Sequence, residues 1–287
     1  MIVPGDKTGE ALVNQTSRGV AGFFRARQIV KIAKAEAEAS LIKTKSDIEN
    51  AELRQRAVHE FEAREVWHQQ NVDAIERMAE PLLLTDGANP EAVDEDWRAN
   101  VFEKCRIVSD EEMQSLWARV IAGEVNTPGS FTRRTVNRIA DLDKYDCELF
   151  TRLCRINVSI GDFTNPLIID LDAAVYSEHG IESDLLAHLD SIGLIHFMAP
   201  NLEHTLSNLL RWPVSYFDRR FLLEMPGGLD TLPIGRARLT RVGRELAPIS
   251  GATPIPAFLD YLLATWSHLL KPMPPDEGGA ADPPHAR

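Results

Sequence analysis

Residues 109–135 have the sequence SDEEMQSLWARVIAGEVNTPGSFTRRT, and this stretch specifies the fold more densely than any other. Its apolar residues follow the i, i+3, i+4, i+7, i+8 spacing of an amphipathic helix: Met113, Leu116, Trp117, Val120 and Ile121. Ser109 is the predicted N-cap, and Glu112 can return a bond to its N–H as in a capping box. Gly123 is predicted to end the helix as a left-handed C′ residue.

A second helix is predicted directly after this one. Pro128-Gly129 is turn chemistry, and either Ser130 or Thr132 can cap the helix that follows. The acidic pair Glu111-Glu112 lies in the first turn of the first helix, where capping and the helix dipole account for it. We therefore prefer a structural role for these acids over acid–base catalysis.

Length and composition favour an ordinary globular protein. The 287 residues suffice for two domains, or for one domain with a long helical appendage, and 44% are hydrophobic and 26% charged. A net charge of −12 argues against nucleic-acid binding by the whole chain, although it permits a local basic patch. No signal-like segment or apolar run of about 18 residues occurs. We expect a cytoplasmic protein, with peripheral contact at the inner membrane left open.

Composition and periodicity divide the chain into five segments of a mainly α protein. They are a flexible lead (1–17), a long coiled-coil-like helical segment (18–84), a helical bundle (94–156), a winged-helix-like α+β domain (157–270) and a disordered tail (271–287). The long segment is rich in Ala, Glu, Lys, Arg and Gln, but its apolar residues are sparse and show no strict heptad. Such a helix is expected to pack against another copy or against the body of the protein.

The winged-helix prediction rests on the order of elements in the last third of the chain. A helix at 181–191 precedes a strand at 194–197, and strands at 221–225 and 232–234 flank a Pro-Gly-Gly turn to form a hairpin. A helix capped by Thr240 then follows, and a final helix is predicted at 258–270. The segment 201–213 is an atypical insertion in this pattern.

No catalytic or metal-binding motif emerges from the sequence. P-loop, dinucleotide-binding and nucleophile-elbow patterns are absent, and the histidines form no H-x-x-x-H pair. Cys105, Cys147 and Cys154 form no C-x-x-C pair and are predicted to be small core residues. We therefore expect a protein that is not an enzyme and uses no cofactor.

A basic, apolar segment near the N-terminus is one candidate contact. It contains Phe23, Phe24, Arg25, Arg27 and Lys31. A basic amphipathic helix of this kind can lie on an anionic membrane or on a partner protein. The alternative is a helix start whose phenylalanines pack into the protein.

Two arginine clusters are candidate anion or partner contacts. The first contains Arg133 and Arg134 near the start of a helix, and the alternative for it is a solvated face that pairs with Asp141 or Asp143. The second contains Arg236, Arg238, Arg241 and Arg244 near the predicted wing. The candidate recognition helix at 181–191 is acidic and would be repelled by DNA phosphates. We therefore favour a protein-interaction winged helix over a DNA-binding one.

These motifs resemble a bacterial family of unknown function. The resemblance rests on DEEMQ (110–114), LW (116–117), IAGE (121–124), PGSF (128–131) and RT (134–135), with an upstream helix like KAEAE (34–38). The family is related to abortive-infection proteins of phage defence and supplies no catalytic residues. The resemblance implies a non-enzymatic antiphage defence or stress protein that self-associates and contacts a partner encoded in the same operon. The alternative is a winged-helix DNA-binding regulator.

Overall fold

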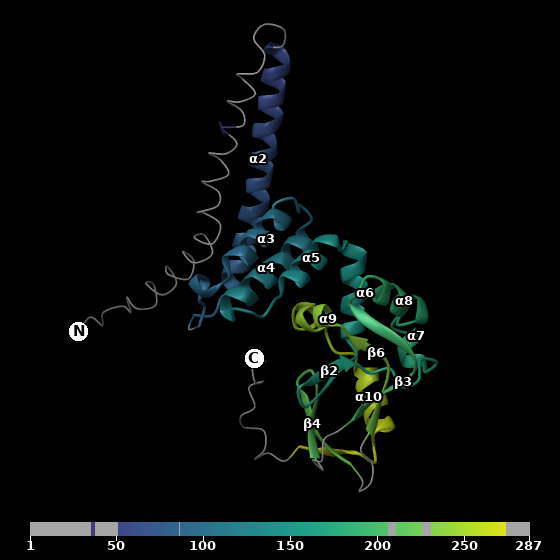
Figure 1. The fold of residues 1–287 in the computed structure, drawn as a ribbon. Helices are drawn as coiled ribbons and strands as arrows, with labels where there is room; N and C mark the ends of the chain where they lie inside the picture. Colours follow the sequence, from purple (N-terminus) through teal and green to yellow (C-terminus); the bar gives the residue numbers. More distant parts are fainter. Residues whose placement is uncertain (1–35, 38–50, 86, 206–210, 226–230, 274–287) are drawn as a thin grey trace, which may run out of the picture. The chain divides into compact units, whose positions relative to one another are not determined.

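The computed structural model describes residues 36–37, 51–85, 87–205, 211–225 and 231–273 (Figure 1). Helices are the main secondary structure of these residues and small antiparallel sheets complete it, which confirms an α-rich fold. The chain divides into two compact units, Met1–Leu142 and Asp143–Arg287. This division lies upstream of the boundary at 156–157 predicted from the sequence. The predicted lead (1–17) and most of the predicted tail lie outside the described residues.

The first unit is helical. Its elements are α2 (Ala51–Ala79), the short 3-10 turns η1 (Glu80–Leu82) and η2 (Pro90–Ala92), α3 (Glu95–Cys105), α4 (Glu111–Asn126) and α5 (Arg133–Asp141). Helix α4 is the centre of this unit, because it packs against α2 and carries Trp117 and Ile121, whose side chains are fully buried. Helix α3 packs against α5. Asp94 caps α3 by accepting the Trp97 N–H.

The ends of α4 differ from the prediction. Asp110 is the N-cap instead of Ser109, and its carboxylate accepts the N–H of Met113 at 3.0 Å. Gly123 does not end the helix, which continues to Asn126. Instead, the missing side chain of Gly123 leaves room for the ring of Phe131, whose Cε2 would lie 2.7 Å from a Cβ at this position.

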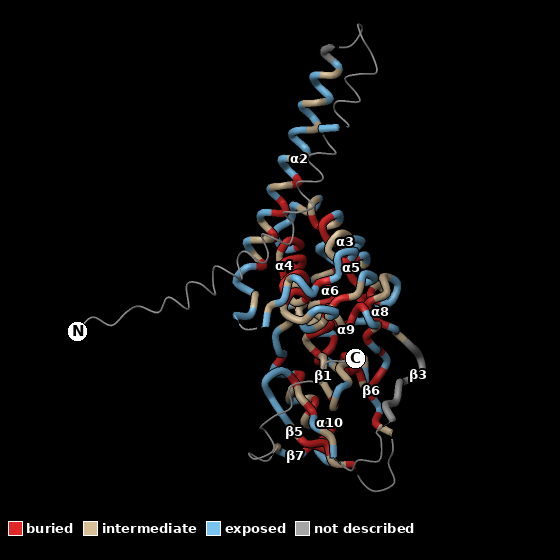
Figure 2. The backbone as a smooth tube through the Cα atoms, turned by 60° about the vertical axis from the view of Figure 1, so that its left-hand side comes forward, coloured by how far each residue is buried: buried red, intermediate tan, exposed pale blue. Residues whose placement is uncertain are grey.

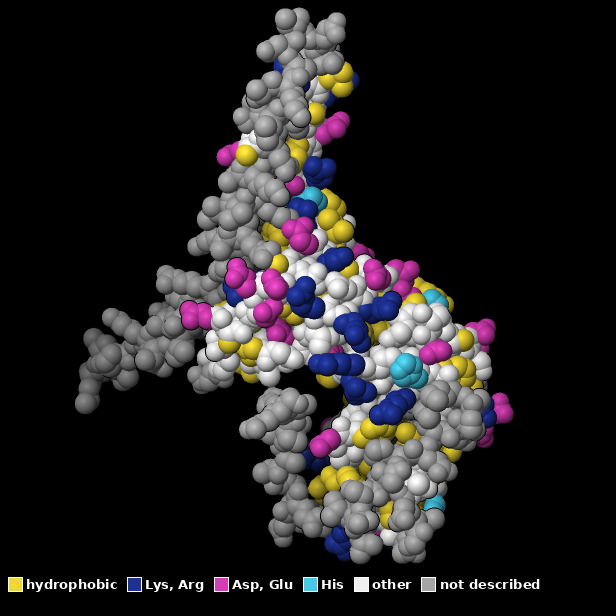
Figure 3. Space-filling model, in the orientation of Figure 1, with side chains coloured by type: hydrophobic (Ala, Val, Ile, Leu, Met, Phe, Trp, Pro, Cys, Tyr) yellow, Lys and Arg dark blue, Asp and Glu magenta, His cyan; other side chains and the backbone are white. Residues whose placement is uncertain are grey.

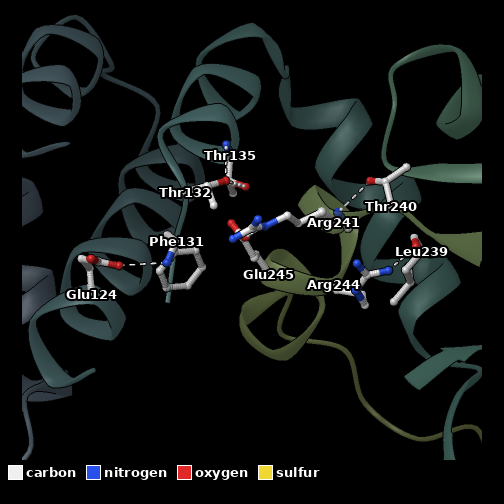
Figure 4. A network of polar contacts seen from close by, with 10 residues as sticks. Glu124, Phe131, Thr132, Thr135, Leu239, Thr240, Arg241, Arg244 and Glu245 are labelled. Carbon is white, nitrogen blue, oxygen red and sulfur yellow. Dashed lines mark hydrogen bonds and ion pairs between the residues drawn. The ribbon is translucent and has the colours of Figure 1, made fainter. Parts of the chain in front are cut away.

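The turn after α4 is held by a buried carboxylate (Figure 4). Glu124 is 3% exposed, and its two oxygens accept the backbone N–H groups of Gly129 at 2.6 Å and Phe131 at 2.8 Å. Thr132 then caps α5 by accepting the N–H of Thr135, which confirms one of the two predicted caps. The IAGE and PGSF motifs thus form one local structure, in which Gly123 receives the Phe131 ring and Glu124 bonds the turn.

The second unit mixes helices and strands. Its helices are α6 (Lys144–Cys154), α7 (Ala174–Ser177), α8 (Ser183–Ser191), α9 (Arg241–Leu246), the 3-10 turn η3 (Ala247–Ile249) and α10 (Pro256–Thr265). Its strands are β1 (Asn157–Ile160), β2 (Phe163–Pro166), β3 (Ile195–Thr205), β4 (Arg211–Tyr216), β5 (Arg219–Glu224), β6 (Thr231–Leu239) and β7 (Leu270–Pro272). Asp143 caps α6 in a capping box with Asp146.

The strand pairing differs from the predicted wing. One antiparallel sheet has the order β2-β1-β4-β5-β7, and a separate ribbon pairs β3 with β6. The predicted hairpin between residues 221–225 and 232–234 is therefore wrong, because β5 pairs with β4 and β7 while β6 pairs with β3. Along the chain, the β4–β5 hairpin lies between β3 and β6, the two strands of the ribbon. The order α8, β3, β6, α9 is as predicted, and its likeness to a winged helix stays a prediction.

Two local features complete the second unit. The predicted last helix is too long, since α10 ends at Thr265 and the chain turns at Trp266 before forming β7. The Tyr216 hydroxyl accepts the N–H of Ile255 at 2.7 Å and donates to the carbonyl of Arg155 at 2.8 Å, so it ties the sheet to the segment before α10. Burial raises the pKa of Tyr216.

Candidate interaction surfaces

Helix α2 is the first candidate surface, because its side chains are fully buried over only part of the length that the structure describes. Its 29 residues extend over ~43 Å at about 1.5 Å per residue. The buried side chains on α2 begin at His68 and continue with Asn71, Val72, Ile75 and Ala79. From Leu53 to Trp67 no side chain is buried (Figure 2). The end of the helix thus anchors it in the first unit, whereas its beginning does not contribute to the core.

The buried and half-buried positions of α2 follow a heptad repeat that is not visible from the apolar residues alone. Half-buried positions precede the buried ones with alternating spacings of four and three residues: Arg54, Val58, Phe61 and Glu65, followed by His68, Val72, Ile75 and Ala79. This is the a/d spacing of a coiled-coil seam. Polar residues occupy several of its positions, which explains why the sequence shows no strict apolar heptad.

Large apolar side chains are exposed on α2 outside this seam. Leu53 and Val66 are each 57% exposed and Trp67 is 40% exposed. Ile107, in the loop between α3 and α4, is 56% exposed. Figure 3 shows apolar side chains interspersed with charged ones along this helix. Most of the exposed large hydrophobic residues in the described part of the chain belong to the first unit.

A charged network lies where α2 enters the core. Arg106 reaches Glu103 at 3.3 Å and Glu65 at 3.8 Å, and one of its N–H groups lies 3.4 Å from Nδ1 of His68. Burial, reinforced by the Arg106 charge, lowers the pKa of His68, although Glu65 opposes the shift. The Asn71 amide donates to the Arg106 carbonyl at 2.9 Å, so this network fixes α2 against the loop after α3.

The first predicted arginine cluster lies at the start of α5. Arg133 and Arg134 are both exposed, and Arg133 lies 3.6 Å from the Asp96 carboxylate on α3. The partner is therefore Asp96, and neither Asp141 nor Asp143, which the sequence analysis named as alternatives, forms this pair. Both charges of the pair are largely exposed, so it contributes little to stability.

The second predicted cluster lies on β6 and α9. Arg236 and Arg238 alternate on β6 and are exposed, and the guanidinium of Arg238 lies 5.6 Å from the centre of the Phe163 ring. Arg241 on α9 pairs with Glu245 at 2.9 Å, one helical turn later (Figure 4). Figure 3 shows basic side chains gathered on the visible face where β6 and α9 lie. The structure thus brings the four predicted arginines of this cluster, Arg244 on α9 included, onto neighbouring elements of one unit.

Helix α8 presents the opposite charge. Glu182, Asp184 and Asp190 are all exposed on or beside it. An acidic surface in the position of a recognition helix would repel the phosphates of DNA.

The remaining predicted features are placed as follows. Phe23, Phe24, Arg25, Arg27 and Lys31 lie outside the described residues. Cys105 and Cys154 are buried and Cys147 is half-buried, and burial raises the pKa of the Cys154 thiol to about 12. Within the described ranges, no group of His, Cys, Asp and Glu side chains could hold a metal ion. None of the described helices has both the length and the apolar character needed to cross a membrane.

Comparison with known proteins assigns the chain to a family. The model of a family described as protein of unknown function (DUF2806) matches residues 55–263. No curated protein and no solved structure matches the chain. The match covers both units and begins within α2, and the chain belongs to this family. The predicted relation to abortive-infection proteins stays a prediction.

Proposed function

We propose that this member of the DUF2806 family acts by contact, through self-association of its helical unit, in bacterial antiphage defence or stress. The observation that carries the proposal is the unburied beginning of α2, which exposes Leu53, Val66 and Trp67. A helix segment that packs against few of the other described residues gains little stability from its own hydrogen bonds in water. Exposed apolar side chains on such a helix favour a protein partner.

A second copy of the chain is the partner that α2 fits best. Leu53, Val66 and Trp67 lie outside the half-buried seam, so they leave an apolar surface on α2 for a second copy. Acidic and basic residues alternate along the same segment, for example Arg56, Glu60 and Arg64. A helix with both signs interspersed can pair with a copy of itself without net repulsion.

The mass of the full chain in solution tests self-association. Sedimentation velocity over a range of concentrations is expected to give species larger than the 32.1-kDa chain. Val66→Glu and Trp67→Glu place a charge at exposed positions and are expected to shift the protein toward the single-chain mass. Leu84→Glu is the matched control, because Leu84 is 54% exposed in the same unit but lies beyond the end of α2. A single chain at every concentration would overturn the proposal.

The role in defence rests on the family resemblance and needs a cellular test. Cells that express the chain are expected to reduce plaque formation by at least some phages, and Trp67→Glu is expected to remove the protection while Leu84→Glu keeps it. Unchanged plating by a broad phage panel would refute the defence role. Protection that survives in a demonstrably monomeric variant would separate defence from self-association.

Peripheral membrane contact is a further part of this proposal and rests on the sequence of the N-terminal segment. Its aromatic and basic residues have the composition of a surface-bound helix. The full chain is expected to float with anionic vesicles, and Phe23→Asp with Phe24→Asp is expected to abolish flotation. Flotation that persists in the double variant would exclude this segment as the anchor.

DNA binding is the alternative, and the exposed arginines of β6 and α9 favour it. Duplex binding through phosphate contacts would weaken steeply as salt rises. It would also fall strongly in the Arg238→Ala, Arg241→Ala double variant. The exposed acids of α8 are the reason that we rank this function second.

A further inference from the structure

The second unit contains a cavity that self-association does not use. It has a volume of about 560 Å3 and lies between the polar face of the sheet formed by β1, β2 and β4 and the segment from Arg244 to Ala252. Pockets for small ligands typically have volumes of about 300–1,000 Å3. The lining is mainly polar on the sheet side and mainly small and apolar on the other side.

A row of hydroxyl groups crosses the floor of this cavity. Ser159 on β1 lies opposite Thr164 on β2 and opposite Ser215 on β4, so the three residues are neighbours across three strands. The hydroxyls of Ser159 and Thr164 are 2.7 Å apart. Val158 and Ile160 are buried on the other face of β1, which leaves its polar residues on the cavity side.

Two further polar groups of the cavity have unused capacity. The side-chain oxygen of Asn157 is buried and accepts no hydrogen bond. Buried polar atoms in proteins are nearly always bonded to protein, water or ligand. Asp162 also lines the cavity, and its carboxylate forms no ion pair with any residue that the structure describes. These oxygens can accept hydrogen bonds from ligand hydroxyl or amino groups.

Arg244 supplies the positive charge of the cavity. One of its N–H groups donates to the Leu239 carbonyl at 3.1 Å (Figure 4), and no other partner occurs among the residues described. A guanidinium has five N–H donors in a planar fork that suits phosphate oxygens. Arg241, on the same helix, is instead paired with Glu245 and does not line the cavity.

Phe217 provides an aromatic surface at the same cavity. It lies in the turn between β4 and β5, and its side chain is 39% exposed. Its φ of +50° is in the left-handed region, as the two-residue loop of the β4–β5 hairpin requires at its first position. An exposed aromatic ring can stack on a planar ligand ring.

We propose that this cavity binds a small phosphate ester with a hydroxylated body and a planar ring, which is the chemistry of a mononucleotide. Arg244 and the hydroxyl row bind the phosphate, Asn157 and Asp162 accept from the sugar or from an amino group, and Phe217 stacks on the ring. The proposal goes beyond self-association and concerns a different unit.

Calorimetric titration of the full chain tests this assignment. The probes are adenosine monophosphate, ribose 5-phosphate, adenosine and inorganic phosphate, so that ring, sugar and phosphate are separated. The mononucleotide is expected to bind saturably and more tightly than each of the other three. Arg244→Gln is expected to weaken mononucleotide binding by at least about tenfold, since it removes a charge-assisted contact. Arg241→Gln, the matched control, is expected to change it by less than about twofold.

The ring contact has its own variant. Phe217→Leu is expected to weaken the mononucleotide but to leave ribose 5-phosphate unchanged. Equal binding of these two probes to the natural chain would overturn the nucleotide assignment. Absence of saturable binding by all four probes at millimolar concentration, or equal losses in Arg244→Gln and Arg241→Gln, would overturn the site itself. Circular dichroism of each variant verifies its fold, and Arg244→Lys, which keeps the charge but loses the fork, is expected to fall between the natural chain and Arg244→Gln.

Discussion

Replacing Glu124 by Gln is expected to destabilise the first unit severely, although the side chain keeps its shape. The carboxylate presents two oxygens to two N–H donors, those of Gly129 and Phe131, and is 3% exposed. The amide keeps one oxygen and turns its NH2 group toward the second donor. One charge-assisted bond is weakened to a neutral one and one buried N–H loses its acceptor.

The size of the effect follows from these two losses. A hydrogen bond to a charged group contributes about 1.5–3 kcal/mol and an unsatisfied buried donor costs about 1–3 kcal/mol. Glu124→Gln is therefore expected to lower the free energy of unfolding by ~2–4 kcal/mol. Glu124→Ala is expected to cost ~3–5 kcal/mol, because both donors lose their acceptor.

Urea unfolding followed by pulsed hydrogen exchange and mass spectrometry measures this effect in the intact chain. Peptides from residues 111–141 report on the first unit separately from the second, which matters because two units need not unfold together. Glu111→Gln is the control: Glu111 is exposed in the first turn of α4, where its charge contributes less than about 1 kcal/mol through the helix dipole. A loss below about 1 kcal/mol for Glu124→Gln would refute the inference that this carboxylate holds the turn.

Three further outcomes follow from other contacts. Gly243→Ala would drive a Cβ into the Leu194 carbonyl. The free energy of unfolding of the second unit, measured by urea titration, is therefore expected to fall by ~2–4 kcal/mol despite the better helix propensity of Ala. Unchanged stability would show that α9 can move away. The pKa of His68 is lowered in the folded chain. At pH values just below the ordinary histidine pKa of about 6.5, the unfolded chain therefore binds more protons than the folded chain. The first unit is therefore expected to lose stability as pH falls from 7 to 5, and His68→Gln is expected to flatten this profile; a slope that persists in the variant would assign it to other groups. Tyr216→Phe leaves the Ile255 N–H without its acceptor and is expected to cost ~1–3 kcal/mol by thermal unfolding, whereas a neutral effect would mean that water replaces the hydroxyl.

Local chemistry made the helices of the first unit predictable from the sequence. Thr132 is a cap because this short polar side chain directly precedes a periodic apolar run, and it caps α5 in the structure. The sequence predicts Ser109 as the cap of α4, but the adjacent Asp110 offers the same chemistry and is the cap in the structure. Gly123 was misassigned as a stop because the ring that occupies its space comes from Phe131, eight residues later.

Strand pairing was less predictable, because it depends on contacts that are distant in sequence. The hairpin of β1 and β2 was not predicted, since Ser159 and Thr164 give these short strands a polar face that resembles a loop. The wrong partner predicted for β5 has the same origin. The turn-like Pro-Gly-Gly segment in the sequence suggests a hairpin with the strand that follows it, whereas β5 pairs with β4. Arg236, Arg238 and Arg241 are exposed, and their role as contacts stays a prediction. The sequence does not indicate the cavity beside Arg244, because its lining comes from separate strands.

The interleaving of the two sheets has a consequence for how this protein can be divided. The chain leaves the ribbon after β3, builds the β4–β5 hairpin into the other sheet and returns to the ribbon as β6. A fragment that stops before β6 would leave β3 without its partner, and one that omits β4 would uncover the edge of β1. Unpaired strand edges invite aggregation. Fragments for laboratory study should therefore keep residues 157–272 intact, and proteolytic trimming within this range is expected to yield insoluble material.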